Sequence, residues 1–289
     1  MYFPAAEITT NPLLPFVVAL GISFCTSMGG VSGAILLLPF LMSGLGYTNP
    51  SVSATNQFFN IVACPGGVYR YYKEGRLLWP VSATIALGTL PGVFVGALLR
   101  ITVLPDPSDF RLFAGCVLLY VGLRMVRTLL TEQAVKKQEN RQASIRMEKA
   151  DGAKIAFTYD QTLYTVSKRS LMLLSAVVGL VGGIYGIGGG AMMAPFLVSF
   201  FGLPVYVVAG ATLLATAITS LGGVCFYTLL STVYEGIQTA PDWRMGLCIG
   251  FGGMVGMYLG ARCQKFVRAV VIKWMLALIL LGTAIRYVL

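Results

Sequence analysis

Long apolar runs follow one another along the whole chain, separated by short polar segments. Runs in which apolar and polar residues do not alternate, such as Leu276 to Leu281, predict helices and not the strands of a membrane barrel. A helix of about 20 residues crosses the hydrocarbon core of a bilayer. Runs of that length cover roughly 50–72, 77–99, 110–130, 205–232, 243–263 and 270–289.

Two further apolar stretches, at roughly 12–46 and 170–202, are interrupted by glycine clusters and reveal an internal repeat. A shift of 156 positions places the first cluster, Gly30–Gly33, on the second, Gly186–Gly189. The shift grows to 164 after the next loop, because the second half has gained residues there. Each half therefore predicts a glycine-broken helix pair or hairpin followed by three transmembrane helices.

The composition agrees with a chain that lies mostly in a bilayer. Apolar residues make up 56% of the sequence and charged residues 11%, with a mean hydropathy of +0.78. A soluble domain carries about 25% charged residues. The predicted fold class is an all-α integral membrane protein with two inverted-topology repeats and about 8–10 membrane segments.

Basic residues orient the predicted spans, because Lys and Arg concentrate in short cytoplasmic loops. This placement explains the net charge of +10 without a nucleic-acid partner. A polar linker at roughly 131–169 is placed in the cytoplasm because it carries Lys136, Lys137, Arg141, Arg146, Lys149, Lys154, Lys168 and Arg169.

The remaining loops then alternate in charge as an inverted repeat requires. The loop with Arg70, Lys73 and Arg76 is cytoplasmic, and its counterpart with Glu235 and Asp242 is external. The neutral loop that starts at Arg100 is external, and its basic counterpart with Arg262, Lys265 and Arg268 is cytoplasmic. The chain is expected to cross the cell inner membrane several times, with both termini on its external side.

Three parts follow from this pattern: a first transmembrane repeat at 1–130, a cytoplasmic basic linker at 131–169 and a second transmembrane repeat at 170–289. Within the linker, polar and apolar residues alternate on both sides of Asp160. This alternation predicts a small hairpin of two strands.

The two glycine breaks are the candidate functional site. Unwound backbone is tolerated at membrane depth only where it is buried in protein or lines a wet cavity. Helices that begin at Gly33 and Gly189 would direct free N–H groups and positive dipole ends at an oxyanion. The alternative is close helix packing, which we favour for Gly92-xxx-Gly96 but not for the breaks, because matched broken helices are typical of transporters.

Polar residues follow each break, and they either bind substrate oxygens or hydrogen-bond to neighbouring helices, two interpretations of equal weight. In the first half they can share one helical face. The predicted substrate-binding residues are Gly29, Gly30, Ser32, Gly33, Thr55, Asn56, Asn60, Gly186, Gly188, Gly189, Gly190, Thr212 and Thr216.

Several chemistries lack their residues. The chain has no histidine, and no Asp or Glu lies in the central part of a predicted span. Zinc ligation and a Ser-His-Asp triad are therefore excluded, and a proton relay of carboxylates or imidazoles has no obvious members. We expect no enzyme activity, no cofactor and no metal. The expected partners are a small-molecule anion and the lipid bilayer, and a homodimer is left open.

The order of these motifs resembles the sulfite exporter TauE/SafE family of membrane permeases. The likeness rests on the GGVSG and LPF stretch, the SATN run, the PGG span, the GTLPGVFVGA span and the GIYGIGGGAMMAPFL copy. Each motif is mostly glycine and apolar residues, so the specificity comes from their order and duplication. The resemblance implies outward transport of sulfite, sulfoacetate or a related sulfur-containing anion.

The predicted function is export of such an anion by alternating access, with an anion channel or a membrane-bound assembly protein as alternatives. An inside-negative potential favours the expulsion of each net negative charge by about 2.3 kcal/mol per 100 mV. Uncoupled export therefore needs no partner ion. Saturable flux with counterflow would distinguish the carrier from a channel, which would give single-channel currents.

Overall fold

The structure is a computed structural model of the chain. It describes residues 1–132, 145–148, 153–234, 236–264, 266–267 and 269–288. The predicted loop roles of Lys136, Lys137, Arg141, Lys149, Glu235, Lys265 and Arg268 concern residues outside these ranges.

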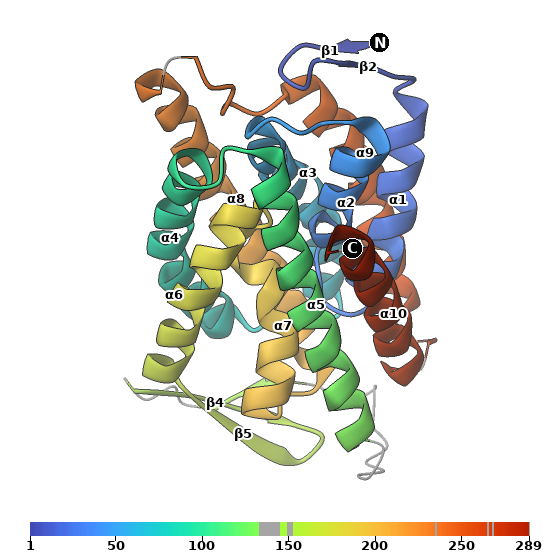
Figure 1. Cartoon of the computed structure of the whole chain (residues 1–289). Coiled ribbons are helices and arrows are strands. Elements are labelled where there is room, and N and C mark those ends of the chain that lie inside the picture. The colour runs from blue at the N-terminus through green and yellow to red at the C-terminus, as the bar shows by residue number, and fades with distance from the viewer. Residues whose placement is uncertain (133–144, 149–152, 235, 265, 268, 289) are drawn as a thin grey trace.

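Helices gathered into one bundle make up most of the described chain (Figure 1). The first half contributes α1 (Leu13–Ser27), α2 (Ala34–Pro39), its π-helical continuation η1 (Phe40–Gly44), α3 (Ser51–Lys73), α4 (Trp79–Thr102) and α5 (Pro107–Glu132). The second half contributes α6 (Lys168–Tyr185), α7 (Gly188–Phe201), α8 (Val205–Val233), α9 (Trp243–Cys263) and α10 (Ala269–Val288). Each half thus has the predicted broken pair followed by three helices.

Within the described residues, three helices are long and apolar enough to cross a membrane: α4, α6 and α8. Shorter apolar helices cover Leu13–Ser27, Ala34–Gly44, Gly188–Phe201 and Trp274–Tyr287. The chain is therefore a helical membrane protein.

Small sheets mark the two ends of the bundle (Figure 1). Strands β1 (Tyr2–Phe3) and β2 (Ile8–Thr9) lie at one end, which we call the N-terminal end. Strands β3 (Arg146–Met147), β4 (Lys154–Tyr159) and β5 (Thr162–Ser167) lie at the other, the hairpin end. Since α1 follows β2 and α6 follows β5, the two halves begin at opposite ends.

The predicted linker hairpin is confirmed. Strands β4 and β5 pair antiparallel from Lys154 with Ser167 to Tyr159 with Thr162. The two turn residues, Asp160 and Gln161, both have positive φ angles, as a two-residue hairpin turn of type I′ requires.

Glycines let α4 lie directly on the backbone of α6. A Cβ atom at Gly92 would be 2.3 Å from the carbonyl oxygen of Ala176, and one at Gly96 2.3 Å from that of Leu180. Only glycine permits this approach. The packing role favoured for these two glycines is confirmed.

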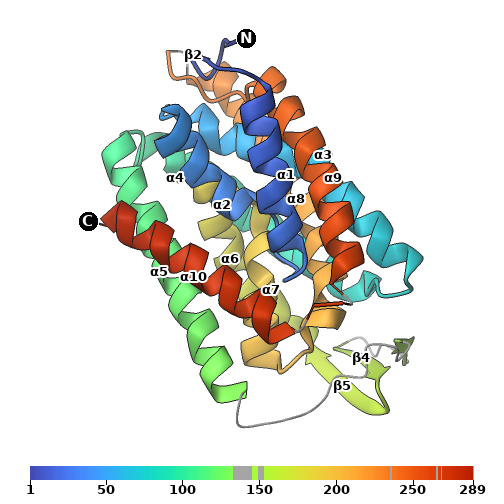
Figure 2. The same ribbon diagram turned by 90° about the vertical axis from the view of Figure 1, so that its right-hand side faces the viewer.

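The repeat image of this contact joins α9 to α1, which lie side by side in Figure 2. A Cβ atom at Gly256 would be 2.3 Å from the carbonyl oxygen of Leu20, and one at Gly260 2.2 Å from that of Phe24. The two halves therefore use matched glycines to hold each other's first helix.

Candidate substrate site

The two breaks differ in length. Residues 28–33 separate α1 from α2, whereas only Gly186 and Ile187 separate α6 from α7. Helix α2 begins at Ala34 and α7 at Gly188, each one residue from the predicted start. The predicted site residues Gly188, Gly189 and Gly190 thus form the first turn of α7, not a loop.

Glycine is required at one position in each break by both conformation and space. Gly30 has a φ angle of +71° and Gly186 one of +82°, a left-handed region that favours glycine. A Cβ atom at Gly30 would lie 2.6 Å from the Cα atom of Ala209, and one at Gly186 2.4 Å from the carbonyl oxygen of Ser53. Each break therefore lies against the third helix of the opposite half.

Asn60 on α3 connects the two breaks. Its Nδ2 donates to the carbonyl oxygen of Ile187 at 2.9 Å and to Ser220 Oγ at 3.2 Å, while its Oδ1 accepts from Ser32 Oγ. Asn60 and Ser32 are both completely buried. One amide thus holds the first break against the second.

Other predicted site residues also bond to the breaks or to the helices that follow them. Thr212 Oγ1 donates to the carbonyl oxygen of Gly30 at 2.8 Å, and Asn56 Nδ2 to that of Ala34 at 2.9 Å. Thr216 bonds within its own helix, to the carbonyl oxygen of Thr212 at 2.7 Å. These side chains do gather around the breaks.

Thr55 is an exception, because its partners belong to the N-terminal end. Its Oγ1 lies 2.7 Å from the Tyr47 hydroxyl and accepts from the backbone N–H of Asp242 at 2.8 Å. The Asp242 carboxylate in turn accepts from the N–H groups of Ala5 and Ala6, at 3.0 and 3.2 Å. Thr55 therefore helps to close this end of the bundle.

Several buried polar atoms on α1 and α3 have no hydrogen-bond partner, and the Gln57 side chain among them lies against Gly223 of α8. They are Asn56 Oδ1, both side-chain polar atoms of Gln57, Ser23 Oγ and Thr26 Oγ1. A buried polar group without a hydrogen bond costs about 1–3 kcal/mol. Gln57 was not among the predicted site residues. Its position directly after Asn56, at the end of the SATN run, could have indicated it. These atoms can bind a polar ligand.

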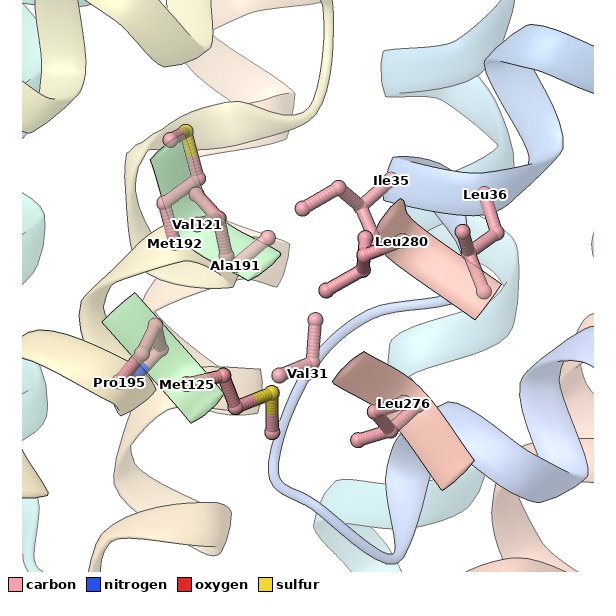
Figure 3. A pocket seen from close by; sticks show the side chains of 10 residues that line it. All are labelled: Val31, Ile35, Leu36, Val121, Met125, Ala191, Met192, Pro195, Leu276 and Leu280. Atoms are coloured by element: carbon pink, nitrogen blue, oxygen red, sulfur yellow. The ribbon is translucent and has the colours of Figure 1, made fainter. Parts of the chain in front are cut away.

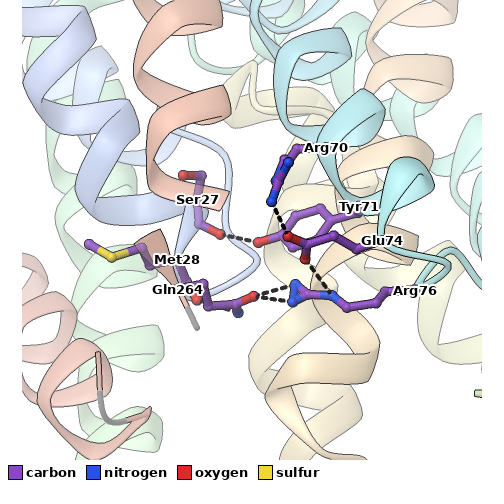
Figure 4. Close-up of polar contacts among 7 residues, drawn as sticks. All are labelled: Ser27, Met28, Arg70, Tyr71, Glu74, Arg76 and Gln264. Atoms are coloured by element: carbon purple, nitrogen blue, oxygen red, sulfur yellow. Dashed lines mark hydrogen bonds and ion pairs between the residues drawn. The ribbon is translucent and has the colours of Figure 1, made fainter. Parts of the chain in front are cut away.

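A polar cluster lies at the hairpin end, beneath the first break (Figure 4). Arg76 is only 3% exposed, and its Nη1 donates to Gln264 Oε1 at 3.0 Å. Its Nε lies 3.4 Å from Glu74 Oε2. Gln264 Nε2 donates to the carbonyl oxygen of Met28 at 2.7 Å. The cluster ties the end of α9 and the α3–α4 loop to the break.

An apolar pocket is enclosed by the first break together with α2, α5, α7 and α10 (Figure 3). Its lining residues are Val31, Ile35, Leu36, Val121, Met125, Ala191, Met192, Pro195, Leu276 and Leu280. Because every lining residue is apolar, the pocket offers an anion no hydrogen bond. The polar atoms around Asn60 and Gln57 are the better substrate site.

Comparisons with known proteins agree with a membrane transporter. The chain is 26% identical to "Probable membrane transporter protein" of Xylella fastidiosa (strain Temecula1), over 83% of this chain and 79% of that protein. It is 24% identical to "Probable membrane transporter protein YunE" of Bacillus subtilis (strain 168), over 90% of this chain and 92% of YunE. "Probable membrane transporter protein YdhB" of the same strain is 29% identical, with 85% and 86% covered. No solved structure matches the chain.

A family model covers nearly the whole chain. The model described as "Sulfite exporter TauE/SafE" matches residues 15–287, which include both breaks and every helix from α2 to α9. The resemblance seen in the motifs is thereby confirmed. The chain belongs to the sulfite exporter TauE/SafE family of membrane transporters.

Proposed function

We propose that the chain is a carrier, not an enzyme, that exports a small sulfur-containing oxyanion such as sulfite or sulfoacetate. The observation that carries this proposal is the Asn60 amide, which joins two broken helices deep inside a membrane protein. Broken helices that meet inside a bundle are the usual substrate sites of transporters with internal repeats. The site comprises the thirteen predicted residues except Thr55, with Gln57 added.

The carrier consists of two inverted-topology repeats. Contacts recur at the sequence shift of 156: the Tyr71 hydroxyl donates to the carbonyl oxygen of Ser27, and the Tyr227 hydroxyl to that of Gly183, both at 2.9 Å. The first helices of the halves also begin at opposite ends of the bundle. Both observations support an inverted arrangement. The basic residues of the linker are our reason to assign the hairpin end to the cytoplasm and both termini to the outside of a cell inner membrane.

Alternating access explains the closure at both ends better than a channel does. The Arg76 cluster closes the hairpin end, and the contacts of Asp242 with Ala5 and Ala6 close the N-terminal end. A channel needs a path open to both sides at once. In a carrier, the two closures open in turn.

The chemistry of the site suits an anion that must be released again. Neutral amides and hydroxyls bind oxyanions without a permanent countercharge. The N–H of Ala34 at the start of α2 is already bonded to Ser32 Oγ, so we assign any backbone N–H donation to the start of α7, which has no side-chain cap. A weakly held ion can leave when one end opens. We therefore assign the substrate oxygens to the partners around Asn60 and Gln57.

Flux of labelled sulfite in proteoliposomes tests this function. An inside-positive potential of 100 mV is expected to concentrate sulfite inside about 50-fold for each net charge moved, which corresponds to about 2.3 kcal/mol. At zero potential, internal unlabelled sulfite should accelerate uptake by counterflow. Protein-free liposomes are the control, and a strict need for a proton or sodium gradient at zero potential would contradict uncoupled transport.

A further inference from the structure

Arg100 is a buried arginine for which the proposed transport site has no use. It lies in the last turn of α4, at the N-terminal end of the bundle, and its side chain is 0% exposed. The sequence placed it at the start of an external loop. The structure instead buries its charge among helices.

The guanidinium is fixed on one side and free on the other. Its Nη1 donates to the carbonyl oxygen of Leu104, and its central carbon, Cζ, lies 3.8 Å from the centre of the Phe110 ring. Its Nε and Nη2 are buried without a hydrogen-bond partner. These two nitrogens share one edge of the guanidinium, so their N–H groups point the same way, as a fork that fits two oxygens of one anion.

A buried charge of this kind calls for a counterion. Charged groups are costly in the protein interior unless they are paired, and buried arginines usually bond to a carboxylate. Among the described residues, no carboxylate pairs with Arg100. The free edge therefore has two buried N–H donors that no protein group uses.

The position of Arg100 connects it with the second break. Tyr227 belongs to one buried cluster with Ala97 and Ile101, which flank Arg100 on α4. The Tyr227 hydroxyl donates to the carbonyl oxygen of Gly183, just before the break. The ring of Phe110, beneath the guanidinium, has its centre 6.5 Å from that of Tyr185 at the end of α6. Phe110 thus links Arg100 to the end of α6, next to the second break.

In the other half of the protein, the position that corresponds to Arg100 holds a residue whose side chain is hydrogen-bonded. The shift of 164 positions aligns Arg100 with Gln264, whose amide bonds to the first break at Met28. There the guanidinium of Arg76 is engaged by Gln264 and by Glu74. One end of the bundle therefore has a paired arginine, and the other has an arginine whose Nε and Nη2 have no hydrogen-bond partner.

We propose that Arg100 is a second anion-binding site, in which two oxygens of a sulfite or sulfonate group bind to its Nε and Nη2. The role of this site in transport rests on the proposed function. If the N-terminal end is external, Arg100 receives the anion after it leaves the breaks. The binding itself does not depend on that direction. The site selects oxyanions that present two oxygens side by side.

Titration calorimetry of sulfite binding to the purified full-length protein tests the proposal. Wild type should bind sulfite at two sites, Arg100→Gln at one, and Asn60→Leu at the Arg100 site alone. Arg100→Lys keeps the charge but loses the fork, so it should bind at the second site at least about 10-fold more weakly. The control Arg111→Gln removes an exposed charge near the same end and should bind like wild type.

A purely structural role for Arg100 gives different results. Removing an unpaired buried charge should leave the melting temperature without sulfite unchanged or higher, whereas loss of a structural contact should lower it. Arg100→Gln with wild-type affinity and stoichiometry, or with a lower melting temperature and unchanged binding, would overturn the proposal. If Arg100→Gln binds sulfite like wild type while Asn60→Leu stops transport, the second site fails and the proposed function stands. If Arg100→Gln loses one site and no variant, wild type included, transports sulfite, the proposed function fails instead.

Discussion

Replacing Asn60 with leucine is expected to stop sulfite transport while the protein still inserts and purifies. The variant loses the amide that bonds to Ile187 on the second break and to Ser32 on the first. Two or more hydrogen bonds at the site correspond to roughly a 100-fold loss of flux, at about 1–1.5 kcal/mol each. The flux of labelled sulfite in proteoliposomes measures this loss, with size-exclusion chromatography as the check on folding.

A matched control removes one contact of Asn60 and leaves the connection between the breaks. Ser220→Ala loses only the bond at 3.2 Å from Asn60 Nδ2, so it should keep most of the flux. Gly189→Leu would be a poorer test, because a Cβ atom there would lie 2.3 Å from the Cβ of Thr89 and disturb packing. If Asn60→Leu transports sulfite as fast as wild type, the substrate site does not lie at Asn60.

Gly96→Leu is expected to prevent normal folding. A Cβ atom at Gly96 would lie 2.3 Å from the carbonyl oxygen of Leu180 and 2.8 Å from the N atom of Ile184. Both are backbone atoms of α6, which cannot rotate away as a side chain can. Overpacking of this kind costs about 3 kcal/mol or more, and α4 would have to separate from α6. The yield of monodisperse protein and its melting temperature measure the effect.

Gly21→Leu is the matched control for this substitution. Gly21 lies on an exposed face of α1, and nothing comes within 4 Å of a Cβ atom there. The added side chain should change the melting temperature by little. If Gly96→Leu and Gly21→Leu behave alike, the close approach of α4 to α6 does not hold the halves together.

Much of the helix arrangement could be predicted because apolar runs and glycine spacing have strong physical causes. The span expected at roughly 50–72 is Ser51–Lys73, and that expected at 243–263 is Trp243–Cys263. The linker hairpin around Asp160 was equally visible, because side chains of a strand point to opposite faces in turn and so alternate between polar and apolar.

The length of the second break could not be predicted, because glycine serves two purposes. Gly182 and Gly183 remain helical, and each lies against another backbone: a Cβ atom would be 2.7 Å from the carbonyl oxygen of Gly188 and 2.5 Å from that of Val93, respectively. A glycine that breaks a helix and one that lets helices touch look the same in a sequence.

The hydrogen-bond partners of the polar residues could not be predicted from the sequence either. Thr55 sits little more than one turn from Asn60 on α3, yet it bonds to Asp242, which is 187 positions away. Arg76 and Arg100 carried the charge pattern of loop anchors, and both are buried. Charge statistics place a residue near a membrane surface, whereas burial depends on which helices meet there.

Crystals grown with sulfite test the central claim most directly, through anomalous scattering by sulfur. The sulfur atoms of the six cysteines and twelve methionines supply internal reference peaks. We predict an additional peak within hydrogen-bonding distance of Asn60 or Gln57, between residues 28–33 and 186–190, and its loss in Asn60→Leu crystals. Sulfite peaks only elsewhere, at Arg100 or on the linker, would contradict a transport site at the two breaks.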